Sequence, residues 1–208
     1  MTDQATHDRS FEVLHAVRVK GLTTDAVLAD FLGVAEDGLA PYTGPLVDAG
    51  LLLRREGRFA GHTLTPAGKE AAAERLTTDT ETRDATPALA RLYDAFLPVN
   101  GDFKRLCERW QVRDGQPNDH TDAAHDQAVF ADLHTLHDAF VPVLREADLP
   151  PRIRRYADRL DGALARIGDG ETGAFARPMN NSYHDIWMEL HEDLIVSGGR
   201  VRDAHDEG

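Results

Sequence analysis

The chain has 208 residues, which is enough for one large domain or two small ones. Hydrophobic residues make up 41% of it and charged residues 28%, as expected of a soluble globular protein, and no run approaches the ~18 apolar residues of a membrane-spanning helix. The net charge is -13. The single cysteine, Cys107, excludes an internal disulfide, and MTDQATHDRS at the start has no basic region followed by an apolar stretch, so we expect a cytoplasmic protein without a secretory signal and without membrane association.

The first predicted elements are three helices. Residues 11–20 and 25–32 each carry apolar side chains at helical spacing, and each run is followed by a glycine, which predicts two short helices. Thr24 is placed to cap the second of them. A third helix should lie within residues 34–49. Because Pro45 would remove a backbone hydrogen bond there, we expect this helix to be short or kinked.

A β-hairpin is predicted after the third helix. Residues 51–55 form a short apolar run that ends in two arginines, residues 56–61 supply turn chemistry, and residues 62–64 form a return strand. Thr65 and Pro66 then have the cap and the first-turn proline of a new helix. Helix, hairpin and helix in this order form the wing of a winged helix-turn-helix. We therefore predict a mainly α protein with an N-terminal winged helix-turn-helix followed by an all-α helical bundle.

The predicted winged helix is expected to bind double-stranded DNA, chiefly through its hairpin. Base reading in the major groove favours Arg, Lys, Asn and Gln, and residues 34–49 contain none of these. Residues 1–78 hold 8 Lys and Arg against 11 Asp and Glu, a net charge of -3, so most of the acidity lies later in the chain. The candidate DNA-contacting residues are Tyr42, Thr43, Arg54, Arg55, Arg58 and His62. The alternative is a winged helix that binds only other proteins.

The segment LVDAGLLLRREGRFAGHTLTPAGKEA resembles the winged helix of MarR-type bacterial transcription regulators. The resemblance covers residues 11–76: a helix ends in "GL", a basic hairpin follows, and "LTPAG" opens the next helix. It implies DNA binding. The sequence departs from the family pattern in the third helix, where Pro41, Gly44 and Pro45 replace the usual polar and basic readers. This segment also resembles winged-helix segments that are attached to actinobacterial enzymes of the pyruvate phosphate dikinase type. That resemblance implies, as the alternative, an adaptor that binds proteins.

The rest of the chain is predicted to be a helical bundle. The polar stretch 77–86 is the expected boundary, unless it is the exposed middle of one longer helix. The predicted domains are residues 1–78 (winged helix-turn-helix), 79–198 (helical bundle for effector binding or dimerisation) and 199–208 (polar tail). The expected helices of the bundle cover residues 86–96, 103–110, 122–147, 153–167, and 173 or 179 to 196. Interruptions are expected at Pro98 and Gly101, and a loop over residues 112–121.

Two segments of this bundle, PVNGDFKRLCERWQVRDGQPNDHTD and NNSYHDIWMELHEDL, resemble a C-terminal domain that accompanies actinobacterial MarR-like proteins. They also contain most of the large aromatic and ligand-type polar residues. We expect an effector pocket for a small organic molecule, with the tryptophans supplying flat surfaces and polar side chains orienting the ligand. The candidate ligand-binding residues are Trp110, Asn118, His120, Tyr183, His184, Trp187, Glu189 and His191. The alternative is that both tryptophans build the bundle core.

Other chemistry has weaker signals. His134 and His137 form an HxxH pair, but no HExxH or paired CxxC motif is present, so no metal ligands and no cofactor are assigned. Cys107 lies on an apolar stripe and is expected in the core, and no catalytic residues are predicted. We therefore expect a homodimeric bacterial regulator whose DNA affinity responds to a small ligand. The alternatives are a protein-interaction adaptor and, third, a metal-binding helical enzyme.

Overall fold

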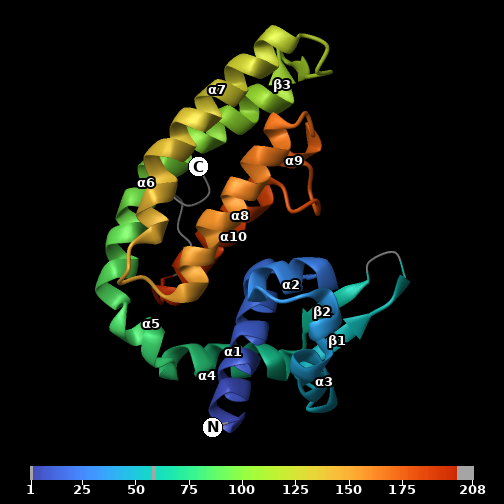
Figure 1. The fold of residues 1–208 in the computed structure, drawn as a ribbon, viewed down its shortest axis with the longest axis vertical. Coiled ribbons are helices and arrows are strands. Elements are labelled where there is room, and N and C mark those ends of the chain that lie inside the picture. Colours follow the sequence, from blue (N-terminus) through green and yellow to red (C-terminus); the bar gives the residue numbers. More distant parts are fainter. Residues whose placement is uncertain (1, 58–59, 201–208) are drawn as a thin grey trace. The chain divides into compact units, whose positions relative to one another are not determined.

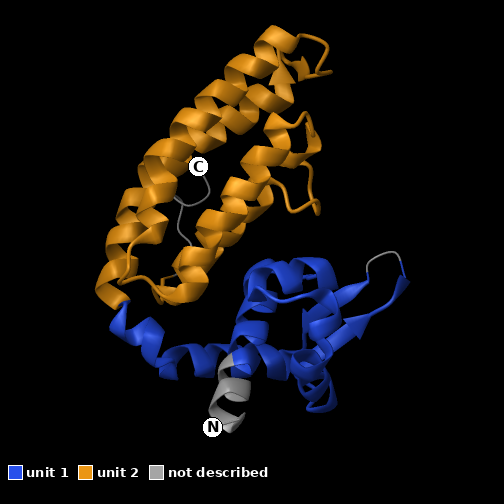
Figure 2. Ribbon diagram, in the orientation of Figure 1, with its two compact units in different colours: residues 1–85 blue, residues 86–208 orange. Residues whose placement is uncertain are grey.

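The computed structural model describes residues 2–57 and 60–200, with side chains from residue 9 onward. It is mainly helical, with two small two-stranded antiparallel sheets, which confirms the predicted mainly α class (Figure 1). The chain divides into two compact units, residues 1–85 and 86–208 (Figure 2). This division falls inside the polar stretch 77–86 where the boundary was expected, seven residues after the end of the predicted domain 1–78. In the part of the chain that is described, no helix is both long and apolar enough to cross a lipid bilayer.

The N-terminal unit consists of helices and one hairpin. Its elements are α1 (Thr2–Lys20), α2 (Asp25–Leu32), the 3-10 helix η1 (Glu36–Gly38), α3 (Ala40–Asp48), β1 (Leu52–Arg55), β2 (Gly61–Leu64), α4 (Pro66–Thr78) and α5 (Thr80–Asp84). The predicted ends of α2 are confirmed. The Thr24 hydroxyl accepts a hydrogen bond from the Val27 amide at 3.3 Å, and Gly33 closes the helix in the left-handed conformation. The first helix is longer than predicted, since it begins at Thr2.

The third helix is short, as predicted, although Pro45 lies inside it. Its nine residues start at Ala40, with Pro41 in the first turn, where a missing amide hydrogen costs no helical bond. The missing bond of Pro45 is tolerated because its acceptor would be the carbonyl of Pro41, an exposed first-turn residue that water can reach.

Hydrogen bonds join both ends of the β1–β2 hairpin to the neighbouring helices and their connecting segments. β1 and β2 pair antiparallel with Leu52 opposite Leu64. Thr23, between α1 and α2, bridges to His62 through two backbone hydrogen bonds of 3.0 and 2.7 Å. At the other end the Thr65 hydroxyl donates to the Gly50 carbonyl at 2.7 Å and also caps α4. A Cβ at Gly68 would lie 2.0 Å from the Leu51 carbonyl oxygen, so only glycine allows α4 to approach this closely.

The C-terminal unit is a bundle of long helices. Its elements are α6 (Thr86–Gln111), β3 (Val112–Arg113), β4 (Gln116–Pro117), α7 (Ala123–Phe140), the 3-10 helix η3 (Val141–Arg145), α8 (Pro151–Gly168), α9 (Gly173–Ala176) and α10 (Tyr183–Ser197).

Several boundaries predicted for this unit are wrong. Helix α6 runs through Pro98 and Gly101 without a break, because its apolar stripe continues across them and Pro98 lies on the exposed side, where water can solvate the unpaired carbonyl. The expected loop over residues 112–121 contains a small hairpin. The helix predicted to reach residue 147 ends at Phe140, before Pro142.

The last helix begins at Tyr183, and α9 is separate from it. Ser182 fixes this start through a capping box: its hydroxyl accepts from the Asp185 amide at 3.1 Å, and the Asp185 carboxylate accepts from the Ser182 amide at 3.3 Å.

The core of the C-terminal unit is aromatic. Trp187 is 0% exposed, and its ring lies 4.7 Å from Phe103, 5.0 Å from Phe96 and 5.2 Å from Phe140, measured between ring centroids. Its indole N–H donates to the Asn100 side-chain oxygen at 2.9 Å, which satisfies the one polar group of the ring. Cys107 is also buried, as predicted.

Candidate nucleic-acid interface and ligand cavity

Arg54 is the centre of a charged cluster at the hairpin. Its guanidinium bonds both carboxylate oxygens of Asp25 at 3.0 and 3.3 Å, and its Nε lies 3.3 Å from a Glu56 oxygen. Burial would raise the pKa of Asp25, but hydrogen bonds and charge from Arg54 and His62 outweigh it and lower that pKa below its usual 3.8. The Arg54 side chain remains 48% exposed, so the ion pair is open to solvent.

Two residues predicted to contact DNA are buried instead. His62 is 1% exposed, and its Nε2 lies 2.9 Å from an Asp25 oxygen, so the ring holds α2 to the hairpin. Thr43 is 6% exposed, and its hydroxyl donates to the Leu39 carbonyl one turn earlier at 3.3 Å. Both belong to the framework of the unit rather than to its accessible surface; the partner of His62 is 37 residues away, whereas Thr43 is turned inward and bonded within its own helix.

The other candidates for DNA contact differ in exposure. Arg55 is exposed on β1, with its Nε 3.4 Å from the Thr63 hydroxyl. Tyr42 is half-buried, with the Arg9 guanidinium 6.0 Å from its ring centroid. Arg58 lies outside the described residues. The exposed positions of α3 are small, proline or acidic: Ala40, Pro41, Pro45 and Asp48.

The eight residues predicted to bind an effector do not form one pocket. Tyr183, Trp187, Glu189 and His191 are all under 5% exposed and belong to the core. His184 lines a hollow of about 230 Å³ between α6 and α10, with Phe103, Cys107 and Met188 among its apolar walls. The other three, Trp110, Asn118 and His120, line a different cavity of about 280 Å³. The α10 residues separate because residues close in the sequence of a helix face different sides of it, and the Trp110 group belongs to a different end of α6 from the aromatic core around Trp187.

The Trp110 cavity, lined among others by Trp110, Asn118, His120, Thr172, Gly173 and Arg177, lies where the end of α6 meets α9 and the loop before α7. The Trp110 ring contacts two other rings: Phe175 stacks on it with 4.4 Å between centroids and 8° between the planes, and the His120 ring lies 4.6 Å away at a tilt of 43°. These rings fix a rigid wall for the cavity.

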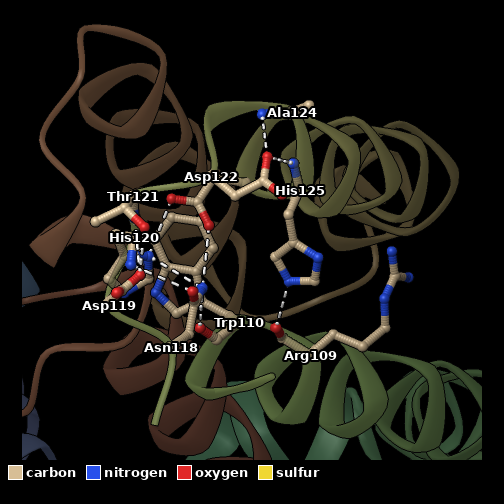
Figure 3. A network of polar contacts seen from close by, with 10 residues as sticks. Arg109, Trp110, Asn118, Asp119, His120, Thr121, Asp122, Ala124 and His125 are labelled. Carbon is tan, nitrogen blue, oxygen red and sulfur yellow. Dashed lines mark hydrogen bonds and ion pairs between the residues drawn. The ribbon is translucent and has the colours of Figure 1, made fainter. Parts of the chain in front are cut away.

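The loop that supplies His120 is held by many hydrogen bonds (Figure 3). Asn118 donates to the Trp110 carbonyl at 3.0 Å, and its side-chain oxygen accepts from the His120 amide at 3.2 Å. His125 lies 3.0 Å from the Arg109 carbonyl, which ties the start of α7 to α6. His120 adopts a left-handed backbone with φ of 58°, which is uncommon for a residue with a side chain. The surrounding contacts stabilise that conformation.

Asp119 and Asp122 shape the same loop (Figure 3). Asp119 accepts from the hydroxyl and the amide of Thr121 at 2.8 and 3.1 Å, and these hydrogen bonds lower its pKa. Asp122 caps α7 by accepting from the amides of Ala124 and His125, and the bond from His125 is the main cause of its lowered pKa. Both carboxylates therefore stabilise the loop in their charged form.

Sequence reasoning missed three residues beside this cavity: Asp126, Phe175 and Arg177. Asp126 bonds His120 and Asn118, and its only signal was a place one turn into a predicted helix. Phe175 and Arg177 lie more than fifty residues from His120 along the chain, so nothing local could connect them with it.

Glu189 belongs to a buried network of ion pairs between α8 and α10. Its carboxylate lies 2.8 Å from the Arg159 guanidinium, and both side chains are 4% exposed. One turn along α10, Asp193 lies 3.8 Å from Arg152 and accepts from the Tyr156 hydroxyl at 3.2 Å. Burial is the main cause that raises the pKa of Tyr156, and the acidic neighbours add to it. These groups join two helices and have no access to a ligand.

The histidine pair of α7 has carboxylate partners. His134 lies 3.4 Å from Asp138, and His137 Nε2 lies 3.0 Å from Asp161 while its Nδ1 faces the Tyr183 hydroxyl at 3.3 Å. Across the described residues, no group of three or more His, Cys, Asp and Glu side chains is arranged to hold a metal ion.

No protein-family model, no curated protein and no solved structure matches this chain. The assignment of a function therefore depends on the contacts described above.

Proposed function

We propose that this protein is a DNA-binding transcription regulator with a winged helix-turn-helix of MarR-like type. The N-terminal unit binds double-stranded DNA, and the C-terminal helical bundle senses a small ligand or joins two copies into a homodimer. The proposal combines the sequence resemblance of residues 11–76 with the geometry of the N-terminal unit.

One observation carries the proposal: the backbone bridge between Thr23 and His62. A winged helix consists of a helix, a short extended segment, the two helices of the helix-turn-helix and a hairpin that returns to pair with that segment. Here Thr23 is the extended segment, α2 and α3 are the helix pair, and the β1–β2 hairpin is the wing.

The wing is the part of the unit suited to phosphate contact. Arg54 and Arg55 are exposed on β1, and guanidinium groups bind phosphate oxygens strongly. Helix α3, which would occupy the major groove, exposes no basic or amide side chain. DNA binding of this kind is expected to depend strongly on salt and to draw its sequence preference from groove shape.

The test is binding of the purified full-length protein to fragmented genomic DNA at low and near-physiological salt. The double variant Arg54→Ala/Arg55→Ala should lose on the order of tenfold or more in affinity, because two phosphate contacts disappear. Arg105→Ala/Arg109→Ala is the matched control, since it removes two exposed arginines from α6 instead. Equal loss in both variants, or binding that is absent at low salt, would overturn the proposal.

A second candidate function is a protein-interaction adaptor. The resemblance of the sequence to segments attached to dikinase-type enzymes also supports this candidate. The observation that favours it is the uncharged and acidic exposed face of α3, together with the pairing of Arg54 by Asp25 and Glu56. Under this alternative, DNA binding would be weak, erased by salt and unchanged in the wing variant.

A further inference from the structure

The Trp110 cavity has the features of a built binding site. Its volume of about 280 Å³ is near the lower end of the range for small-molecule pockets. One wall is the Trp110 ring, which Phe175 supports from within the core by stacking on it, and the polar side chains of the lining are Asn118, His120, Thr172 and Arg177. Two of these, His120 and Arg177, present groups that a ligand could use.

His120 is held in one orientation. His120 Nδ1 lies 3.0 Å from one Asp126 oxygen and 3.2 Å from the Asn118 side-chain nitrogen. The two Asn118 hydrogens are directed to the Trp110 carbonyl and to the other Asp126 oxygen, and a carboxylate can only accept, so the hydrogen of the His120–Asp126 contact is on Nδ1. The other Asp126 oxygen accepts from Asn118 at 3.1 Å, so both carboxylate oxygens are occupied. In the neutral ring, Nε2 is then the acceptor, and no hydrogen bond to it occurs among the described residues.

Arg177 supplies a positive charge to the same cavity. Its stem lies beside Gly173, where an added Cβ would be 3.4 Å from the Arg177 Cδ. Within the described part of the chain its guanidinium forms no ion pair, and Glu171, the acidic residue six positions earlier in the sequence, is paired with Arg166 at 2.7 Å. The hydrogen bonds from Arg166 and Asn180 lower the pKa of Glu171 to about 2, so these contacts favour its charged form.

We propose that the Trp110 cavity binds a small carboxylic acid that also carries a hydroxyl or ammonium group close to its carboxylate. The carboxylate pairs with the Arg177 guanidinium, and the O–H or N–H donates to His120 Nε2. The Thr172 hydroxyl, also on the rim, offers a further contact. This proposal deepens the sensing role given above to the C-terminal unit and names the ligand class.

Calorimetric titration of the full-length protein with L-malate, L-aspartate and succinate tests it. Malate and aspartate each place their hydroxyl or ammonium group one carbon from one carboxylate and two from the other, and succinate lacks both groups. We expect at least one of the first two to bind at millimolar concentration or below, and succinate to bind about tenfold more weakly. Which of the two binds tells whether the donor is a hydroxyl or an ammonium group.

Three variants make the test specific. Arg177→Gln and His120→Asn should each weaken binding about tenfold; asparagine tolerates the left-handed backbone at position 120. Arg109→Gln is the control, because its arginine pairs with Asp132 and does not line the cavity. Circular dichroism confirms that each variant is folded.

The proposal is overturned if none of the three acids binds, if succinate binds as tightly as the others, or if the control variant loses as much affinity as Arg177→Gln. The measurement contains no DNA. Its failure therefore says nothing against DNA binding, and a failure to bind DNA says nothing against this site.

Discussion

Each unit of the protein contains an arginine–carboxylate cluster, and the two clusters differ in burial. In the N-terminal unit Arg54 and Asp25 are 48% and 35% exposed. In the C-terminal unit Arg159 and Glu189 are both 4% exposed. The distances are similar, 3.0 and 2.8 Å, so the chemistry of the contact is the same and only the surroundings differ.

Burial decides what each cluster can do. Water competes for an exposed pair, so the Arg54 pair contributes little to folding and can exchange its carboxylate for another anion. A buried pair cannot be exchanged, because removing one partner leaves the other charged and without water. The Arg54 cluster is therefore suited to binding, and the Arg159 cluster holds α8 to α10.

The largest expected effect comes from breaking the buried pair. Glu189→Ala leaves Arg159 charged in the core and should lower the free energy of unfolding by about 3–5 kcal/mol. Replacing both partners, as in Arg159→Met/Glu189→Leu, should recover much of that loss, because apolar side chains of similar size need no partner. Urea unfolding followed by circular dichroism measures both.

Glu171→Ala is the matched control, since it removes a carboxylate from the exposed pair with Arg166. Its unfolding midpoint should stay close to that of the unchanged protein. If Glu189→Ala were no more destabilising than Glu171→Ala, burial would not distinguish the two kinds of pair.

The same contrast explains which features the sequence could predict. The cap at Thr24, the glycine at position 33 and the Thr65-Pro66 helix start were correct, because each depends on neighbours in the chain. The break expected at Pro98 was wrong, since packing of a continuous apolar stripe outweighs one lost hydrogen bond.

The sites show the same limit. Of the eight residues predicted to share a pocket, only Trp110, Asn118 and His120, which are close in the sequence, line the same cavity. His62 was expected to contact DNA and Glu189 to contact an effector, but both are buried. Their partners, Asp25 and Arg159, are 37 and 30 residues away in the sequence, so local patterns could not reveal the contacts. A charged residue with a distant partner looks like a surface residue in the sequence.

A smaller effect is expected from His137, whose surroundings lie between the two extremes. Burial is the main cause that lowers its pKa below 6.5, and the charge of Asp161 only partly offsets this. The unfolded chain therefore binds the proton more readily in the range just below pH 6.5, and stability should fall as the pH drops through that range. Above pH 6.5 the neutral ring keeps its bond from Tyr183 and this contribution is complete.

The measurement is the free energy of unfolding between about pH 8 and about pH 5. His137→Gln should flatten the decline on the acid side. His134→Gln, which changes an exposed histidine of the same helix, should leave the decline as it was. An identical pH dependence in both variants would mean that burial of His137 has no influence on its titration.

The smallest effect is expected where the charge cluster is most exposed. Asp25→Asn removes one carboxylate that holds Arg54, and its asparagine oxygen can still face His62. Stability should change little, but the released guanidinium becomes available to phosphate, so DNA affinity at low salt should rise about two- to fivefold. The dependence of log affinity on log salt should steepen by about one contact.

Asp37→Asn separates this effect from a general change in charge, because it removes the same charge from an exposed position on η1. If the two variants gain affinity equally, the gain comes from net charge alone and Arg54 has no special part in it. If only Asp25→Asn gains, and the gain disappears when Arg54→Ala is added, the exposed pair is a competitor for phosphate. In that case the wing binds DNA by exchanging one anion for another, which the buried pair of the other unit cannot do.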